Sequence, residues 1–128
     1  MTETERAAGA RAPRVLVVED DDELRLSVTR ALAKAGYEVV LAGTGAAALA
    51  AAAAGAFDAA IVDVFLPDAG GLGVARALRE LAAALPVLFV TGLAVPAVRA
   101  ALAPAPVLFK PFSKRQLLAS VRRLAGAA

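Results

Sequence analysis

The sequence contains no histidine and no cysteine among its 128 residues. Without histidine there can be no histidine base, no imidazole metal ligand and no phosphohistidine. Without cysteine, disulfides, thiol catalysis and thiolate metal sites are excluded. Long apolar runs are also missing, because charged residues, glycine or proline interrupt each one before it could span a bilayer. Any chemistry must therefore rest on the other polar side chains.

The composition is that of one compact domain. Hydrophobic residues make up 59% and charged residues 20%, which is too apolar for a disordered chain. The formal net charge of +2 is too small to predict nucleic-acid binding, and no membrane partner is expected. Residues 1–13 lack the apolar segment of a secretory signal. We therefore predict a flexible leader over residues 1–13, a domain over residues 14–126 and a cytoplasmic location.

Short apolar runs alternate with helical patterns five times along the chain. The predicted strands cover residues 14–18, 37–42, 59–62, 86–90 and 107–109. The predicted helices begin at Asp21 and end before Gly36, then cover residues 46–54, 72–85, 95–102 and 113–124. Ser113 and Gln116 have the spacing of a capping box. This alternation predicts an α/β domain with a parallel sheet and helices on both faces.

Polar residues stand where four of the five strands end: Glu19 and Asp20, then Asp63, Thr91 and Lys110. The carboxyl ends of parallel strands meet at one edge of the sheet, so these side chains should converge. Crowded carboxylates repel one another, and a hard cation with oxygen ligands, such as Mg²⁺, relieves that repulsion. A carboxylate held in place can act as a nucleophile and form an aspartyl phosphate. A lysine beside it would neutralise charge on the phosphoryl group.

The chain resembles the receiver domains of two-component response regulators, of the stand-alone, chemotaxis-regulator-like kind. The resemblance is carried by VLVVEDDDELR, IVDVFLPDAGGL, PVLFVTG and FKPF. Asp20 and Asp63 are separated by 43 positions, Thr91 follows 28 later and Lys110 a further 19 later. The resemblance implies a flavodoxin-like, doubly wound (βα)5 fold with a five-stranded parallel sheet in the order 2-1-3-4-5.

The resemblance also implies a role for each polar residue. Asp63 would be the phosphoacceptor, and Thr91 and Lys110 would contact the phosphoryl group. The implied Mg²⁺ ligands are Glu19, Asp20, Asp63 and the backbone carbonyl of Phe65, with Asp20 the expected direct ligand of the acidic pair. The Lys110–Pro111 peptide bond is expected to be cis. Asp68, in the same loop as Phe65, is predicted to be a solvated surface residue.

The implied function is that of a signalling switch in a phosphorelay. A sensor histidine kinase or phosphotransfer protein would phosphorylate Asp63, and the domain would then change its binding to an unidentified output protein. No enzymatic activity beyond self-phosphorylation and self-dephosphorylation is expected. One alternative is a phosphorylation-independent interaction module. An aspartate-nucleophile phosphatase is disfavoured because Phe65 replaces its second acid, and a nucleotide site because no glycine-rich loop follows the first strand.

The chain departs from the family pattern at several positions. Val107 occupies the place of the family's aromatic switch residue, and Phe109 on the same strand face could partly replace it. The segment between Thr91 and Lys110 is short and contains three prolines, which predicts a short or irregular helix there. Phe65 and Leu93 are apolar at the positions that tune hydrolysis, so slow self-dephosphorylation is expected.

Overall fold

The computed structural model describes residues 11–68, 70–93 and 96–128; the first ten residues of the predicted leader lie outside the described residues. The strands form one parallel sheet in the order β2-β1-β3-β4-β5, as predicted. Their bounds are β1 (Arg14–Val18), β2 (Glu38–Ala42), β3 (Ala59–Asp63), β4 (Val87–Thr91) and β5 (Val107–Phe109). The sheet order confirms the predicted doubly wound fold.

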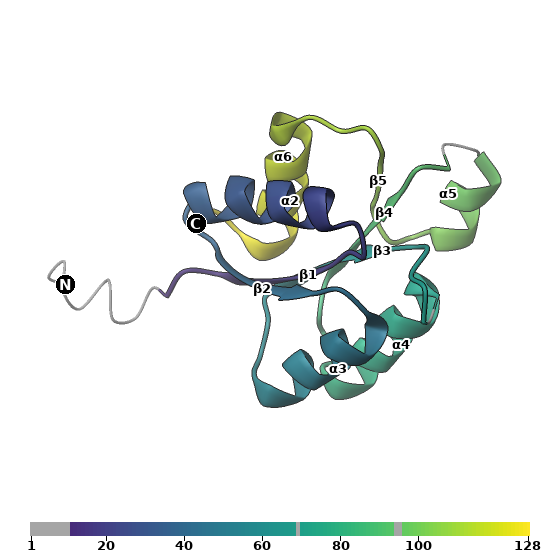
Figure 1. Cartoon of the computed structure of the whole chain (residues 1–128), viewed down its shortest axis with the longest axis horizontal. Coiled ribbons are helices and arrows are strands. Elements are labelled where there is room, and N and C mark those ends of the chain that lie inside the picture. The colour runs from purple at the N-terminus through teal and green to yellow at the C-terminus, as the bar shows by residue number, and fades with distance from the viewer. Residues whose placement is uncertain (1–10, 69, 94–95) are drawn as a thin grey trace, which may run out of the picture.

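Helices cover both faces of the sheet. They are α2 (Asp22–Lys34), α3 (Gly45–Ala54), α4 (Gly71–Leu81), α5 (Pro96–Leu102) and α6 (Lys114–Ala125). In Figure 1, α2 and α6 lie on one face, α3 and α4 lie on the other, and α5 stands apart beside β4 and β5. No helix in the described part of the chain is long and apolar enough to cross a membrane.

The core consists of two apolar clusters, one on each face of the sheet. Alternation along β1 divides its side chains: Val15 and Val17 belong to the cluster under α2 and α6, and Leu16 and Val18 to the cluster facing α3 and α4. All four are at most 1% exposed. Burial of each such side chain contributes about 1.5–3 kcal/mol. The sheet is therefore a rigid platform for the residues at its carboxyl edge.

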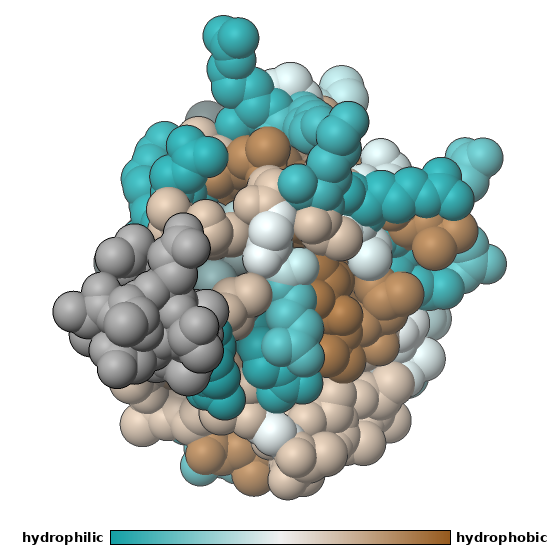
Figure 2. Space-filling model, turned by 90° about the vertical axis from the view of Figure 1, so that its left-hand side faces the viewer, coloured by the Kyte–Doolittle hydropathy of each residue, from teal (hydrophilic) through white to brown (hydrophobic). Residues whose placement is uncertain are grey.

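The two outer surfaces differ in composition. Figure 2 shows hydrophilic side chains over the upper part of the molecule, where α2 and α6 lie, and weakly hydrophobic surface lower down, where α3 lies. Helix α3 is alanine except for Gly45 and Leu49. Because alanine has the highest helix propensity, this segment forms a helix with little help from an amphipathic pattern.

Helix starts follow the predicted local chemistry. The Asp21 carboxylate accepts a hydrogen bond from the Leu24 N–H at 3.0 Å, which caps α2. The predicted capping box of α6 is present, with hydrogen bonds in both directions between Ser113 and Gln116. Gly36, with a φ of 101°, lies just beyond the end of α2, where a side chain would be strained.

The predicted end of α4 is wrong. The helix ends at Leu81, four residues before the predicted position, and Ala82 is already extended with a φ of −146°. Leu85 precedes Pro86, and a residue before proline is disfavoured in helical conformation. The buried Leu85 side chain packs into the core from this non-helical connection. The short helix predicted before β5 is confirmed as the seven-residue α5.

Candidate functional site

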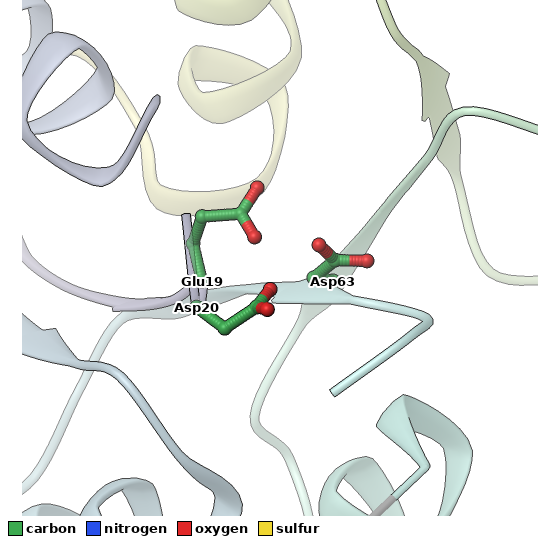
Figure 3. Close-up of side chains that lie close together, drawn as sticks. All are labelled: Glu19, Asp20 and Asp63. Atoms are coloured by element: carbon green, nitrogen blue, oxygen red, sulfur yellow. The ribbon is translucent and has the colours of Figure 1, made fainter. Parts of the chain in front are cut away.

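Three carboxylates meet at the carboxyl edge of the sheet. Glu19 and Asp20 directly follow β1, and Asp63 is the last residue of β3, the neighbouring strand. Oxygen atoms of the three side chains lie within 4.8 Å of one another, and they point toward a common space in Figure 3. Glu19 and Asp63 are each 5% exposed, whereas Asp20 is exposed. The predicted convergence of the acidic residues is thus present.

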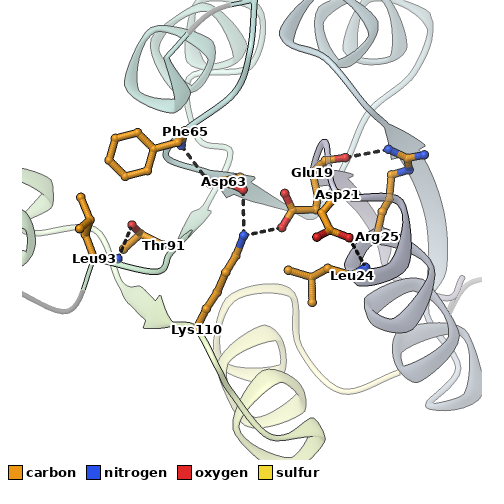
Figure 4. A network of polar contacts seen from close by, with 9 residues as sticks. All are labelled: Glu19, Asp21, Leu24, Arg25, Asp63, Phe65, Thr91, Leu93 and Lys110. Carbon is orange, nitrogen blue, oxygen red and sulfur yellow. Dashed lines mark hydrogen bonds and ion pairs between the residues drawn. The ribbon is translucent and has the colours of Figure 1, made fainter.

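Lys110 links two of these carboxylates. Its Nζ lies 2.7 Å from Glu19 Oε1 and 2.9 Å from Asp63 Oδ2 (Figure 4). The residue directly follows β5, and its backbone N–H donates to the Thr91 carbonyl at 2.8 Å, which continues the pairing of β5 with β4. The Lys110–Pro111 bond is cis, as predicted. One ammonium group therefore bridges side chains from two strands.

These contacts perturb the ionisation of the three groups. Burial, together with the neighbouring Asp63, raises the pKa of Glu19 to about 7. Burial also pushes the pKa of Asp63 upward, but its polar interactions with Glu19, the Phe65 N–H and Lys110 outweigh this effect, and the net shift is downward. Burial opposes the charge of Lys110, but both carboxylates outweigh this effect and raise its pKa. Of the two buried acids, Glu19 therefore holds a proton more readily than Asp63.

The residues present fit a hard divalent cation. Glu19 Oε2 is buried and has no hydrogen-bond partner among the residues that the structure describes. Leaving such an oxygen unsatisfied costs about 1–3 kcal/mol, and more when it is charged. Two further carboxylates lie near it, and all three groups offer oxygen ligands. A cation would satisfy the buried oxygen and offset the repulsion among the acids.

The Asp63 side chain is held on both of its oxygens. Oδ1 accepts a hydrogen bond from the Phe65 N–H at 2.9 Å, and Oδ2 faces Lys110. The carboxylate therefore has one defined orientation before any ligand binds. The Phe65 carbonyl stays a predicted metal ligand, while the Phe65 side chain is 56% exposed at the mouth of the site.

Behind Asp63, the backbone of Gly71 approaches closely. A Cβ atom on Gly71 would lie 2.2 Å from the Asp63 carbonyl oxygen and 2.7 Å from the Val64 Cα. Only glycine fits at that distance. The pair of glycines was visible in the sequence, but nothing local distinguishes Gly71 from Gly70, where a Cβ atom would meet nothing within 4 Å.

Thr91 has a different environment from the charged groups. It is fully buried at the end of β4, and its hydroxyl oxygen accepts a hydrogen bond from the Leu93 N–H at 3.1 Å. Figure 4 shows this contact on the side of the site away from Glu19. The structure thus brings Glu19, Asp20, Asp63 and Lys110 together, and it gives the Thr91 hydroxyl a local backbone partner.

Two supporting contacts were not predicted. Arg25 of α2 donates to the Glu19 backbone carbonyl at 2.9 Å and forms an ion pair with Asp22, which ties the acidic loop to the helix. Asp68 is exposed, as predicted for a solvated loop residue, and it also accepts hydrogen bonds from the N–H groups of Gly45 and Ala46 at 3.0 and 3.2 Å. It therefore fastens the loop after Asp63 to the N-terminus of α3.

The sequence model of the response regulator receiver domain matches residues 15–122, which is most of the chain. The chain belongs to the response regulator receiver domain family. A receiver domain of this family works in two-component systems, and the fold and the acidic edge described above agree with that assignment. The recognition made from the four sequence segments is thus confirmed.

Relatives of two lengths resemble this receiver domain. The response regulator receiver protein CpdR of Brucella abortus is 34% identical over 118 residues, which cover 90% of this chain and 98% of the relative. The response regulator MprA of Mycobacterium avium is 40% identical over 114 residues, which cover 87% of this chain but 50% of the relative. The chain therefore spans about half the length of MprA.

Solved structures share the fold of this receiver domain. The chemotaxis protein CheY4 of Vibrio cholerae superposes with a TM-score of 0.82 at 33% identity, covering 89% of this chain and 99% of that one. The receiver domain of a sensor histidine kinase from Pseudomonas aeruginosa has a TM-score of 0.81 at 27% identity, covering 91% and 100%. That structure contains a magnesium ion coordinated in its active-site cleft.

Proposed function

We propose that this receiver domain accepts a phosphoryl group on Asp63 from a phosphohistidine of a sensor histidine kinase or phosphotransfer protein. The observation that carries the proposal is the Lys110 ammonium, which bridges the buried carboxylates of Glu19 and Asp63 at the carboxyl edge of the sheet. A buried nucleophile, a cation beside it and further acids for a metal are what phosphoryl transfer to a carboxylate requires.

In the proposed reaction, an oxygen of the Asp63 carboxylate attacks the phosphorus atom. The phosphorus–oxygen bond forms as the phosphorus–nitrogen bond to the partner's imidazole breaks, and the electron pair of that bond stays on the imidazole nitrogen. The lowered pKa of Asp63 keeps its carboxylate ionised and nucleophilic at neutral pH. The phosphoryl oxygens carry negative charge, and Lys110 lies within reach of the reacting carboxylate to neutralise it.

The metal in this proposal is Mg²⁺, held by Glu19, Asp20, Asp63 and the Phe65 carbonyl. When bound, it neutralises negative charge on the phosphoryl group. Glu19 Oε2, which has no hydrogen-bond partner among residues 11–68, 70–93 and 96–128, and the clustered carboxylates support this choice. The related domain with magnesium in its cleft supports it as well.

The opposite side of the site is proposed to set the lifetime of the phosphorylated state. The Thr91 hydroxyl accepts from Leu93, so its own proton remains available for a phosphoryl oxygen. Phe65 and Leu93 are 56% and 48% exposed, and neither can orient an attacking water. We therefore expect slow self-dephosphorylation.

We further propose that the domain acts by changing its protein partner and has no separate enzymatic substrate. Phe65 stands where an aspartate-nucleophile phosphatase would need its second acid. The alternative, an interaction module that works without phosphorylation, draws on Val107 at the position of the aromatic switch. The output partner and a cytoplasmic location stay predictions.

Intact-mass measurement after incubation with acetyl phosphate and Mg²⁺ tests the proposal. We expect a gain of one phosphoryl group, its loss in Asp63→Ala, and its retention in Glu23→Gln. Glu23 is an exposed acid in the first turn of α2, so it controls for a general loss of negative charge. No gain in the wild-type protein would overturn the proposal and favour the phosphorylation-independent module, whereas an equal gain in Asp63→Ala would place the phosphoryl group on another residue.

A further inference from the structure

Acidic and basic residues are unevenly distributed along the chain, although the net charge is small. Residues 69–128 contain a single acidic residue, Glu80. The same segment contains eight basic residues: Arg76, Arg79, Arg99, Lys110, Lys114, Arg115, Arg122 and Arg123. Four of these, Lys114, Arg115, Arg122 and Arg123, belong to α6 on one face of the sheet, whereas Arg76 and Arg79 belong to α4 on the other face. Among these residues, Lys110 is already committed to the acidic site.

One cavity lies within this basic part of the molecule. It has a volume of about 380 Å³ and lies between α4 and the segment that joins α5 to β5. Apolar side chains line it, including Ala75 of α4, Val87 and Phe89 of β4, and Leu102 of α5. Its outer end reaches Pro86 and Pro106, which precede β4 and β5. We call this cavity the α4–α5 groove, and it extends toward the end of the sheet opposite Asp63.

One wall of the groove is formed by the short helix α5 and the residues that follow it. The helix has seven residues, and Leu102 is its buried residue. Figure 1 shows α5 standing away from α3 and α4. The lining residues from β4 are buried, and the exposed apolar lining residues lie on α4 and α5 and in the segment after α5.

Arginines are the charged residues that line the groove. Arg76 and Arg79 lie one turn apart on α4 and are both exposed. Neither guanidinium group forms an ion pair within the residues that the structure describes. No acidic side chain of the described residues lines the groove. Two unpaired guanidinium groups beside an apolar floor have the charge and the geometry to bind carboxylates bidentately.

We propose that the α4–α5 groove docks an acidic amphipathic segment of a partner protein. The apolar side chains of that segment lie against Leu72, Ala101 and Pro104, which are exposed apolar residues of the lining, and its carboxylates pair with Arg76 and Arg79. A nucleic acid fits less well, because phosphate binding uses a row of cations and stacking aromatic side chains, whereas the groove offers two cations and an apolar floor. The groove therefore recognises a partner at a place distinct from the phosphoacceptor site.

Titration with two synthetic amphipathic peptides, followed by backbone-amide NMR, tests the inference. Both peptides carry the same leucines; one has glutamate and the other lysine at the polar positions. We expect the glutamate peptide to shift the amides of Ala75, Val87 and Ala105 and the lysine peptide to leave them unchanged. Removing both arginines in Arg76→Gln/Arg79→Gln should weaken binding about tenfold, the value expected for two exposed ion pairs.

The control is Arg30→Gln, which removes an exposed arginine of α2 outside the groove and should leave the affinity unchanged. Equal binding of both peptides, or shifts confined to the acidic edge near Asp63, would overturn the proposal. If raising the protein concentration without peptide gave the same amide shifts, the groove would bind a second copy of the chain, and the proposed partner segment would be wrong. The glutamine variants keep side-chain length, and their own amide spectra report whether the fold is intact.

Discussion

The two sides of the candidate site differ in how they are held. On one side, Glu19 and Asp63 are buried and joined by the Lys110 ammonium. On the other side, Phe65 and Leu93 are exposed apolar side chains, with no ion pair in the described part of the chain. The first side has its charged groups oriented before any ligand arrives. On the second side, the polar side-chain group is the buried Thr91 hydroxyl, which accepts a hydrogen bond from the nearby Leu93 N–H.

This difference predicts that substitutions on the charged side lower stability, whereas substitutions on the apolar side change the rate of hydrolysis. Charges that are buried and paired are costly to disturb, because removing one partner leaves the others without compensation. Replacing an exposed apolar side chain changes the free energy of unfolding little, so changes there should alter the rate of hydrolysis and leave the fold intact. Each of the four predictions below tests one side of this comparison.

The largest effect is expected at the backbone that supports Asp63. Gly71→Ala places a Cβ atom 2.2 Å from the Asp63 carbonyl oxygen, so the loop or β3 must shift. We expect a loss of about 3 kcal/mol in the free energy of unfolding, measured by urea denaturation. The matched control is Gly70→Ala, with a φ of −64° and open space around it, which should change stability by less than about 1 kcal/mol. Equal losses of unfolding free energy in both variants would show that the close approach of Gly71 to the Asp63 backbone does not determine stability.

A pH dependence should follow from Glu19 in the absence of metal. Its pKa is about 7 in the folded protein against an ordinary value of 4.5, so the folded state binds more protons between these values. Stability should therefore fall as the pH rises from about 4.5 to about 7, by an amount on the order of a few kcal/mol. Asp63, with a lowered pKa, loses its stabilising contribution only below this window, and Lys110, with a raised pKa, only above it.

Urea denaturation at several pH values without Mg²⁺ measures this dependence. The chain has no histidine, whose titration would overlap the window. Glu19→Gln should flatten the decline, and Glu23→Gln should leave it as in the wild type. If stability still declined with rising pH in Glu19→Gln, a group other than Glu19 would bind the proton responsible.

On the apolar side, polar replacement should shorten the life of the phosphorylated state. Phe65→Asn and Leu93→Asn each provide a side chain that can orient an attacking water, and about a tenfold faster loss of the phosphoryl group is expected. Intact-mass decay after removal of acetyl phosphate measures the rate. Leu81→Asn is a control on an equally exposed leucine at the end of α4. Unchanged decay in both site variants would rule out shielding by Phe65 and Leu93.

The smallest effect is expected at Thr91. Thr91→Val keeps the buried shape and removes the hydroxyl, leaving the Leu93 N–H without its partner. We expect a loss of about 1 kcal/mol in unfolding free energy and retention of the fold. Thr91→Ser, which restores the hydroxyl, should recover any accompanying loss of phosphorylation measured by intact mass. Phosphorylation that is the same in all three proteins would exclude a role for the hydroxyl.

Much of the fold could be predicted because its signals are local. Short β-branched runs, the Asp21 cap, the Ser113–Gln116 capping box and the alanine helix each depend on neighbours within about one turn. The positions of Glu19, Asp63 and Lys110 at strand ends predicted their convergence once the sheet was taken to be parallel. The predicted end of α4 was wrong because Ala82, Ala83 and Ala84 have high helix propensity, and Pro86 disfavours a helical conformation only at Leu85.

By itself, the sequence determined the order of strands and helices, the family and the four strand ends that carry polar residues. The tertiary structure decided three features around the site: Glu19 Oε2 is buried without a hydrogen-bond partner in the described part of the chain, Asp68 anchors its loop to α3, and Gly71 closely approaches the backbone of Asp63. The physical reason is distance along the chain. Asp68 and Gly45 are 23 residues apart, and contacts of that kind arise from packing of whole layers, which no local pattern of residues encodes.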